Sequence, residues 1–153
     1  MRDPGSVSHS AAIESAATGD TDATLSVFGL RVEREAIRRG FDRAERRVVI
    51  GDGATWIRKL ADELFPGAVE VVDLFHAKQH LSDVAKAVHG PTSDLGRVWA
   101  RQRHAELDEG RLDDLLAALA VHAPTSEEAR RCLGYVTVNR DRMRYPEFRA
   151  QGL

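Results

Sequence analysis

Two short apolar runs in the first half of the chain are bounded by polar residues, and they predict neighbouring strands of a parallel sheet. The first run is Val48–Ile50 and the second is Val69–Val72, and both are rich in β-branched residues. An aspartate follows each run, Asp52 between two glycines and Asp73 directly after the second run. Because the carboxyl ends of parallel strands meet at one edge, where α/β proteins place their sites, both carboxylates are candidate site residues.

Apolar residues elsewhere recur at the helical spacing of three and four positions. The stripe between the two runs predicts a helix over about 54–65, ended by a Pro-Gly pair, so that the three elements form a short parallel β-α-β unit. A helix from Leu25 to about Gly40 precedes this unit, and another follows it and stops at a Gly-Pro pair. From Thr92 the pattern is helical, until Tyr145-Pro146 interrupts it.

These patterns divide the chain into three segments. Residues 1–23 are rich in small and polar residues that cannot bury enough apolar surface to offset the entropy of ordering, which predicts a flexible tail. Residues 24–91 hold the predicted β-α-β core, and residues 92–153 form an all-helical region. The predicted fold class is therefore α/β, a small parallel sheet followed by helices.

Composition narrows the function classes only slightly. The formal net charge is −2, so any contact with DNA has to depend on a local basic cluster. The single cysteine, Cys132, lies on the apolar face of a predicted helix and is expected to be a buried thiol in a reducing compartment. The sequence has no signal peptide and no run of about 18 apolar residues, which predicts a cytoplasmic protein that does not enter a membrane.

A dense arginine cluster surrounds Tyr145 near the end of the sequence. Its members are Arg140, Arg142, Arg144 and Arg149. Arginines placed in this way can follow DNA phosphates. A solvated helical face explains the same residues, so both interpretations stay open at this point.

Asp52 is the first candidate metal ligand. The flanking glycines remove side-chain bulk, so a cation could approach closely, and Mg²⁺ prefers one or two carboxylates together with water and phosphate oxygens. Alternatively, the carboxylate caps the helix that follows by accepting its free N–H groups. The Gly-Asp-Gly sequence itself lacks the third glycine of a dinucleotide fingerprint and the Gly-Lys-Ser/Thr of a phosphate-binding loop.

Asp73, His76 and His80 form a second constellation with the spacing Asp-x2-His-x3-His. The two histidines lie on one side of the predicted helix, and three ligands at this spacing would suit zinc. No glutamate lies between the histidines, as a hydrolase pair requires. The structural alternative is a half-buried His76 that ties the helix to the strand end, with His80 as a solvated neighbour.

Four longer motifs carry a family resemblance. They are Gly51-Asp52-Gly53-Ala54-x-Trp56-Ile57, then Leu64-Phe65-Pro66-Gly67-Ala68, then Val72-Asp73-Leu74-Phe75-His76-Ala77-x-x-His80-Leu81, and finally Asn139-Arg140-x-Arg142-Met143-x-Tyr145-Pro146-x-Phe148-Arg149-Ala150-Gln151-Gly152-Leu153. Together, over about residues 25–153, they resemble the core of the ISKra-type insertion-sequence transposases, relatives of the Mutator-like group.

The resemblance implies an RNase H-like fold in which two aspartates and a glutamate hold two Mg²⁺ or Mn²⁺ ions for attack on a DNA phosphodiester. By motif position Asp52 is the second aspartate and a metal ligand, while Asp73 and His76 match the Asp/Cys-x2-His element, with Asp73 the less favoured catalytic residue. The implied partner is DNA at the ends of an insertion sequence, bound through the arginine cluster, with a full-length transposase as a further candidate partner. Residues 92–153 would be the helical insertion, and the protein would be bacterial and associated with the nucleoid.

The chain departs from the family pattern at both ends. The strand with the first aspartate and the segment with the last glutamate are both missing, so we expect a truncated transposase without strand-transfer activity of its own. Whether this chain binds either ion stays open. Two other interpretations remain: a DNA- or partner-binding module without catalysis, and a small metal-dependent hydrolase that uses Asp52, Asp73 and His76.

Overall fold

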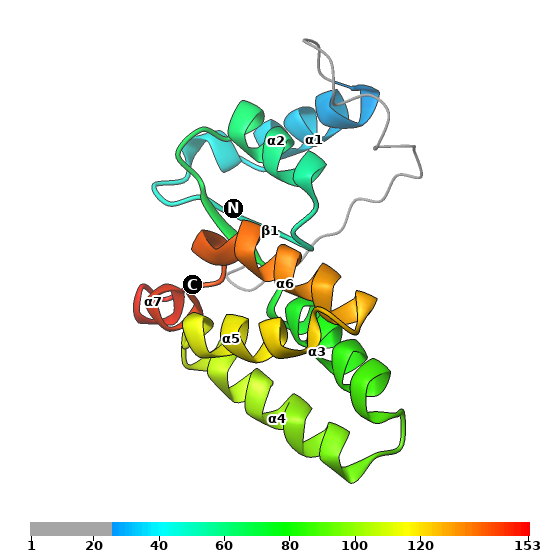
Figure 1. The fold of residues 1–153 in the computed structure, drawn as a ribbon. Helices are drawn as coiled ribbons and strands as arrows, with labels where there is room; N and C mark the ends of the chain where they lie inside the picture. Colours follow the sequence, from blue (N-terminus) through cyan, green and yellow to red (C-terminus); the bar gives the residue numbers. More distant parts are fainter. Residues whose placement is uncertain (1–25) are drawn as a thin grey trace. The chain divides into compact units, whose positions relative to one another are not determined.

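The structure is a computed structural model that describes residues 26–153, so the tail expected over residues 1–23 lies outside the described part of the chain. In chain order the elements are α1 (Val27–Arg38), η1 (Phe41–Arg43), β1 (Val48–Gly51), α2 (Thr55–Leu64), β2 (Val69–Val72), α3 (Leu74–His89), α4 (Asp94–Asp108), α5 (Leu112–His122), α6 (Glu127–Asn139), η2 (Arg140–Arg142) and α7 (Tyr145–Ala150). Figure 1 shows these elements along the chain.

Contacts divide the described chain into two compact units. The first holds the described residues up to Arg47 together with Thr55–Val69, and the second holds Val48–Ala54 together with Glu70–Leu153. The division differs from the boundary expected at residue 91, because helix α3 belongs with the later helices. Each unit has its own internal packing.

The first unit consists of α1, η1 and α2. Ser26 caps α1, since its hydroxyl oxygen accepts the N–H of Gly29 at 2.9 Å. Aromatic rings join the elements edge to face: the Phe28 and Trp56 centroids are 5.7 Å apart, and those of Phe41 and Phe65 are 4.8 Å apart.

Strands β1 and β2 form a parallel two-stranded sheet. The Val69 N–H donates to the Arg47 carbonyl at 2.9 Å, and the Asp73 N–H donates to the Gly51 carbonyl at 2.7 Å. The second of these bonds lies where both strands end. The sequence-based expectation of an α/β chain with a small parallel sheet is therefore confirmed, while an RNase H-like topology stays a prediction.

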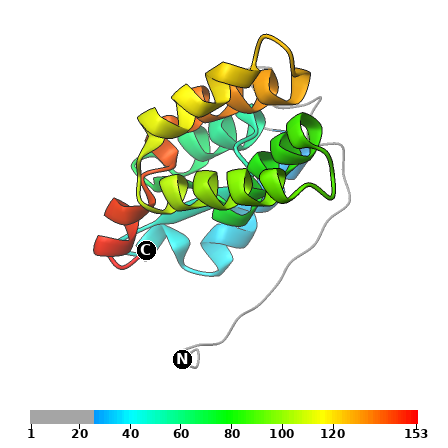
Figure 2. The ribbon, with the colours of Figure 1, turned by 60° about the horizontal axis from the view of Figure 1, so that its bottom comes forward.

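The second unit packs four long helices around one apolar core. Helix α3 contacts α4 and α6, and α5 contacts the same two helices. Both views show α4, α5 and α6 side by side (Figures 1 and 2). The most deeply buried apolar side chains come from β2, from all four helices and from the segment before α7: Val72, Leu81, Val84, Leu107, Leu115, Leu119, Cys132, Val136 and Met143. Cys132 is buried, as expected, and its burial raises the pKa of the thiol to about 12.

The helical pattern is interrupted next to Tyr145-Pro146, where Met143 and Arg144 separate η2 from α7. Helix α7 begins at Tyr145, and Pro146 lies in its first turn, where a missing N–H removes no helical hydrogen bond. The Tyr145 hydroxyl is buried and donates to the Val72 carbonyl at 3.0 Å, which fixes α7 against the end of β2. The pair therefore marks a helix boundary, and proline lies at the start of the helix that follows the break.

Candidate functional site

A hollow of about 460 Å³ opens where β1 and β2 end. We call it the strand-end hollow, and its lining residues are Ile50, Gly51, Asp52, Asp73, His76 and Gln79. It contains both aspartates and one histidine that the sequence singled out. The parallel pairing of the two strands brings the aspartates to the same edge.

The Asp52 loop is held by two hydrogen bonds within the second unit. The Oδ1 atom of Asp52 accepts the N–H of Ala54 at 2.8 Å, and the carbonyl of Asp52 accepts the hydroxyl of Tyr135 at 2.8 Å. Gly53 adopts φ +92°, which L side chains rarely adopt, and a Cβ there would lie 2.7 Å from the Tyr135 ring. Glycine therefore allows this loop to pass close to α6.

Asp73 caps α3, since its Oδ1 accepts the N–H of His76 at 2.9 Å. Each aspartate thus uses one carboxylate oxygen for a backbone N–H. The second oxygen of each accepts no hydrogen bond from any described residue. Both the structural role and a ligand role therefore fit these side chains.

The two histidines are exposed to different degrees from those expected. His76, expected to be half-buried, is exposed, whereas His80, expected to be solvated, is half-buried. The ring of Tyr135 lies beside His80, with centroids 4.5 Å apart, and covers one side of it. The expectation was wrong because the helical pattern of α3 does not reveal that α6 packs over the second imidazole.

Burial sets the electrostatics around these rings. Desolvation, together with the neighbouring His76, lowers the pKa of His80. Desolvation and the nearby charge of Asp52 raise the pKa of the Tyr135 hydroxyl well above its usual range. Near neutral pH, Tyr135 is therefore a neutral hydrogen-bond donor to the loop.

Carboxylates at strand ends are donors that suit Mg²⁺ or Mn²⁺, and the free oxygens of Asp52 and Asp73 fit such an ion chemically. Within residues 26–153 no group of three or more His, Cys, Asp or Glu side chains is placed to hold a metal. The protein donors are therefore two carboxylates, and water or phosphate oxygens would complete the coordination. The expected cluster of Asp73, His76 and His80 does not form a three-ligand group.

The four arginines of the expected DNA-binding cluster do not share one environment. Arg142 is buried and donates to Glu70 at 3.2 Å and to the Asn139 side chain. The other three are exposed, and each has an acidic neighbour: Arg140 pairs with Asp113, Arg144 with Glu147, and Arg149 with the carbonyl and carboxylate of Asp108. Surface contact with a phosphate is thus open to three of the four.

Tyr135 is the residue of this site that the sequence analysis missed. It lies 83 positions after Asp52, and its apolar ring at a helical position looks like an ordinary packing residue. Asn139 opens the fourth sequence motif but was not singled out as a site residue; its side chain donates to the Tyr135 carbonyl at 2.9 Å. No local signal marks the role of Tyr135, because that role depends on how α6 meets the loop.

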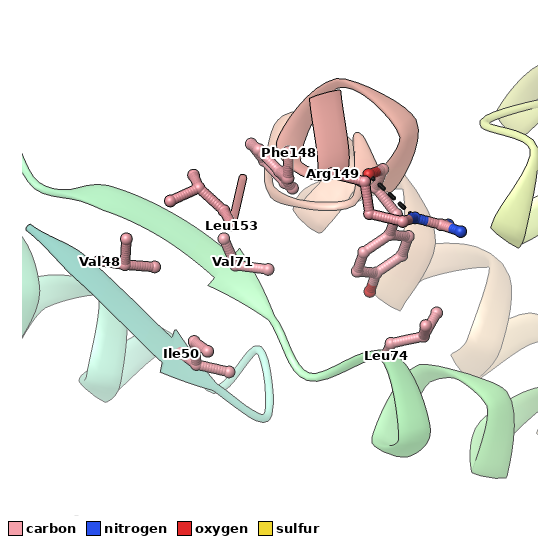
Figure 3. Close-up of a pocket in the computed structure, with 8 residues that line it drawn as sticks. Val48, Ile50, Val71, Leu74, Phe148, Arg149 and Leu153 are labelled. Atoms are coloured by element: carbon pink, nitrogen blue, oxygen red, sulfur yellow. Dashed lines mark hydrogen bonds between the residues drawn. The ribbon is translucent and has the colours of Figure 1, made fainter. Parts of the chain in front are cut away.

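A second hollow, of about 420 Å³, is lined almost entirely by apolar side chains. We call it the apolar groove, and its lining residues are Val48, Ile50, Val71, Leu74, Tyr145, Phe148, Arg149 and Leu153. Figure 3 shows side chains of both strands on the side that faces Phe148 and Leu153. Ile50 lines this groove as well as the strand-end hollow, and two thirds of its surface is exposed.

Comparison with known proteins adds no assignment to this geometry. Every helix in residues 26–153 falls short of the length and apolarity that a membrane crossing requires. No protein-family model, no curated protein and no solved structure matches the chain.

Proposed function

We propose that this chain carries part of the core of a metal-dependent DNA transposase, with Asp52 and Asp73 as carboxylates that bind Mg²⁺ or Mn²⁺. The observation that supports the proposal is the strand-end hollow, where two aspartates from adjacent parallel strands each keep one oxygen free. This is the place where α/β folds position catalytic groups. The sequence motifs around both residues give the reaction class.

In such enzymes the bound ions activate the nucleophile and stabilise the leaving oxygen at a DNA phosphodiester. The described residues contribute orientation: the Ala54 N–H and the Tyr135 hydroxyl hold the Asp52 loop, and the cap of α3 holds Asp73. By the resemblance only Asp52 matches one of the family's three catalytic carboxylates, and Asp73 would be an additional ligand. We therefore expect the isolated chain to bind one ion and to lack strand-transfer activity.

Ion binding tests the ligand assignment. Mn²⁺ binding should be measured by electron paramagnetic resonance on the wild type, Asp52→Asn, Asp73→Asn and the control Asp62→Asn, an exposed aspartate of α2 in the other unit. We expect the first two variants to weaken binding at least about tenfold and the control to leave it unchanged. Equal binding by all four proteins would overturn the proposal.

Catalysis is tested separately with supercoiled plasmid DNA and Mn²⁺. We expect no nicking by the purified chain. Nicking that Asp52→Asn abolishes would show instead that these residues suffice for cleavage.

The family assignment is tested by translating the DNA on both sides of the reading frame. An upstream strand ending in Asp and a downstream Gly-Ser-Gly segment followed by Glu would support the assignment, and the absence of both would count against it.

The second candidate is a binding module without catalysis, which the apolar groove favours because its rim exposes Ile50. DNA binding that weakens steeply with salt and is reduced by the double change Arg140→Ala and Arg144→Ala would support a DNA partner. Failure to bind DNA even at low salt would leave only a protein partner for this candidate.

A further inference from the structure

His76 and His80 approach each other in an unusual way on the surface of α3. Their Nε2 atoms are 3.2 Å apart, and their ring centroids are 4.8 Å apart with an angle of 89° between the planes. The spacing of four residues places both on one face of the helix. The contact therefore brings together two nitrogens that can each donate an electron pair to a metal.

Two explanations of this contact can be separated by geometry. In a linear N–H···N hydrogen bond at this nitrogen spacing, both rings point at each other and the centroids lie about 5.5 Å apart. When two imidazoles instead point at a shared ion about 2.05 Å from each nitrogen, the same nitrogen spacing puts the centroids about 5 Å apart. The observed 4.8 Å is shorter than a linear bond requires and close to the chelating arrangement, so the contact is a bent N–H···N hydrogen bond whose two nitrogens are spaced to share an ion.

The surroundings support a bound ion. His76 is exposed, so an ion can reach the pair from solvent, and Tyr135 packs against His80 and restrains its ring. Imidazole nitrogen suits zinc and its late first-row neighbours, whereas Mg²⁺ and Mn²⁺ prefer oxygen. The pair thus selects a different class of ion from the two aspartates.

We propose that His76 and His80 form a two-histidine site for a divalent transition metal of the zinc type, with the remaining positions filled by water. His76 also lines the strand-end hollow, but the proposed site uses nitrogen ligands and not the carboxylates, and it does not depend on transposase chemistry. It needs no third protein ligand, which agrees with the lack of any three-ligand group in residues 26–153. The open positions leave room for a ligand atom from a partner molecule.

The test is a calorimetric titration of the full chain, purified without a histidine tag, with Zn²⁺. The variants are His76→Gln, His80→Gln and the control His104→Gln, whose imidazole lies elsewhere in the same unit and contacts Ser82 and Lys78. We expect one Zn²⁺ per chain and at least tenfold weaker binding in each of the first two variants. The control should bind as the wild type does.

Circular dichroism melts of each variant confirm that a loss of binding is not a loss of folding. Binding of Zn²⁺ that persists in both His76→Gln and His80→Gln, or no binding by the folded wild type, would overturn the proposal. Asp52→Asn separates this site from the carboxylate pair: it should weaken Mn²⁺ binding and leave Zn²⁺ binding within about threefold. Failure of one proposal is therefore distinguishable from failure of the other.

Discussion

Gly53→Ala tests how closely the Asp52 loop is fitted to α6. A methyl group at Gly53 lies 2.7 Å from Cε2 of Tyr135 and 3.1 Å from both the Tyr135 hydroxyl oxygen and Nδ2 of Asn139. The Tyr135 ring cannot swing away without losing its 2.8 Å hydrogen bond to the Asp52 carbonyl. The substitution must therefore strain the backbone, displace Tyr135, or do both.

The magnitude follows from three effects. Positive φ costs an alanine about 1–2 kcal/mol, and overpacking costs about 1–3 kcal/mol, while the stiffer unfolded chain returns about 0.4–1 kcal/mol. The free energy of unfolding should therefore fall by about 1–5 kcal/mol. Gly90→Ala is a control without a clash, because Gly90 has φ +94° in the same unit and a Cβ there meets nothing within 4 Å. Its ψ of 149° lies in a region almost restricted to glycine, so backbone strain alone should cost about 1–3 kcal/mol there.

The assay is urea unfolding followed by circular dichroism, with both variants repeated in a Tyr135→Ala background. There the loss caused by Gly53→Ala should shrink, giving a coupling of about 1 kcal/mol or more with Tyr135, while the loss caused by Gly90→Ala should stay the same. A loss from Gly53→Ala that is equal in both backgrounds would refute the clash. A stability change below about 0.5 kcal/mol for Gly53→Ala would refute the whole account of the loop.

Three further predictions concern the helical unit. Tyr145→Phe removes the buried hydrogen bond to the Val72 carbonyl, so the free energy of unfolding in urea should fall by about 1–2 kcal/mol, and an unchanged value would contradict that bond. Arg103→Met removes the guanidinium that donates to the buried carboxylate of Glu106 at 2.6 Å, and the free energy of unfolding should fall by about 3–5 kcal/mol. Adding Glu106→Gln should restore much of this free energy. No recovery in the double variant would count against a buried ion pair. Burial lowers the pKa of His104 below its usual 6.5, so the unfolded chain takes up the proton first and the free energy of unfolding should fall as the pH drops below 6.5. His104→Gln should flatten this decline in melts at a series of pH values. An unchanged slope would exclude this histidine as the source of the decline.

Local patterns predicted most of the secondary structure. The second strand begins and ends at the expected residues, and α2 covers most of the helix expected over about 54–65. These features depend on residues a few positions apart, which the sequence displays directly. A cap was considered at Asp52 and not at Asp73, although a polar residue between a strand and a helix is also a local signal.

The surroundings of the site depend on tertiary packing, and sequence patterns did not predict them. Tyr135 reaches the Asp52 loop from α6, and the same side chain half-buries His80. Arg142 looked like a surface cation but is buried beside Glu70, 72 positions away. In each case the partner is far away in the sequence, and neither helical spacing nor composition records the contact.

The hydrogen bonds of the two aspartates determine which substitution isolates a ligand role. Each carboxylate already serves the fold through Oδ1, so replacement by alanine would remove a backbone acceptor together with any metal donor. Asp52→Asn and Asp73→Asn keep an oxygen in the position that accepts the N–H group, since asparagine caps about as well as aspartate. What these variants lose is the negative charge and the second oxygen, which are the properties that a hard cation requires. A loss of Mn²⁺ binding with unchanged melting would therefore reflect the site itself, and a loss of both would reflect the loop and cap that position it.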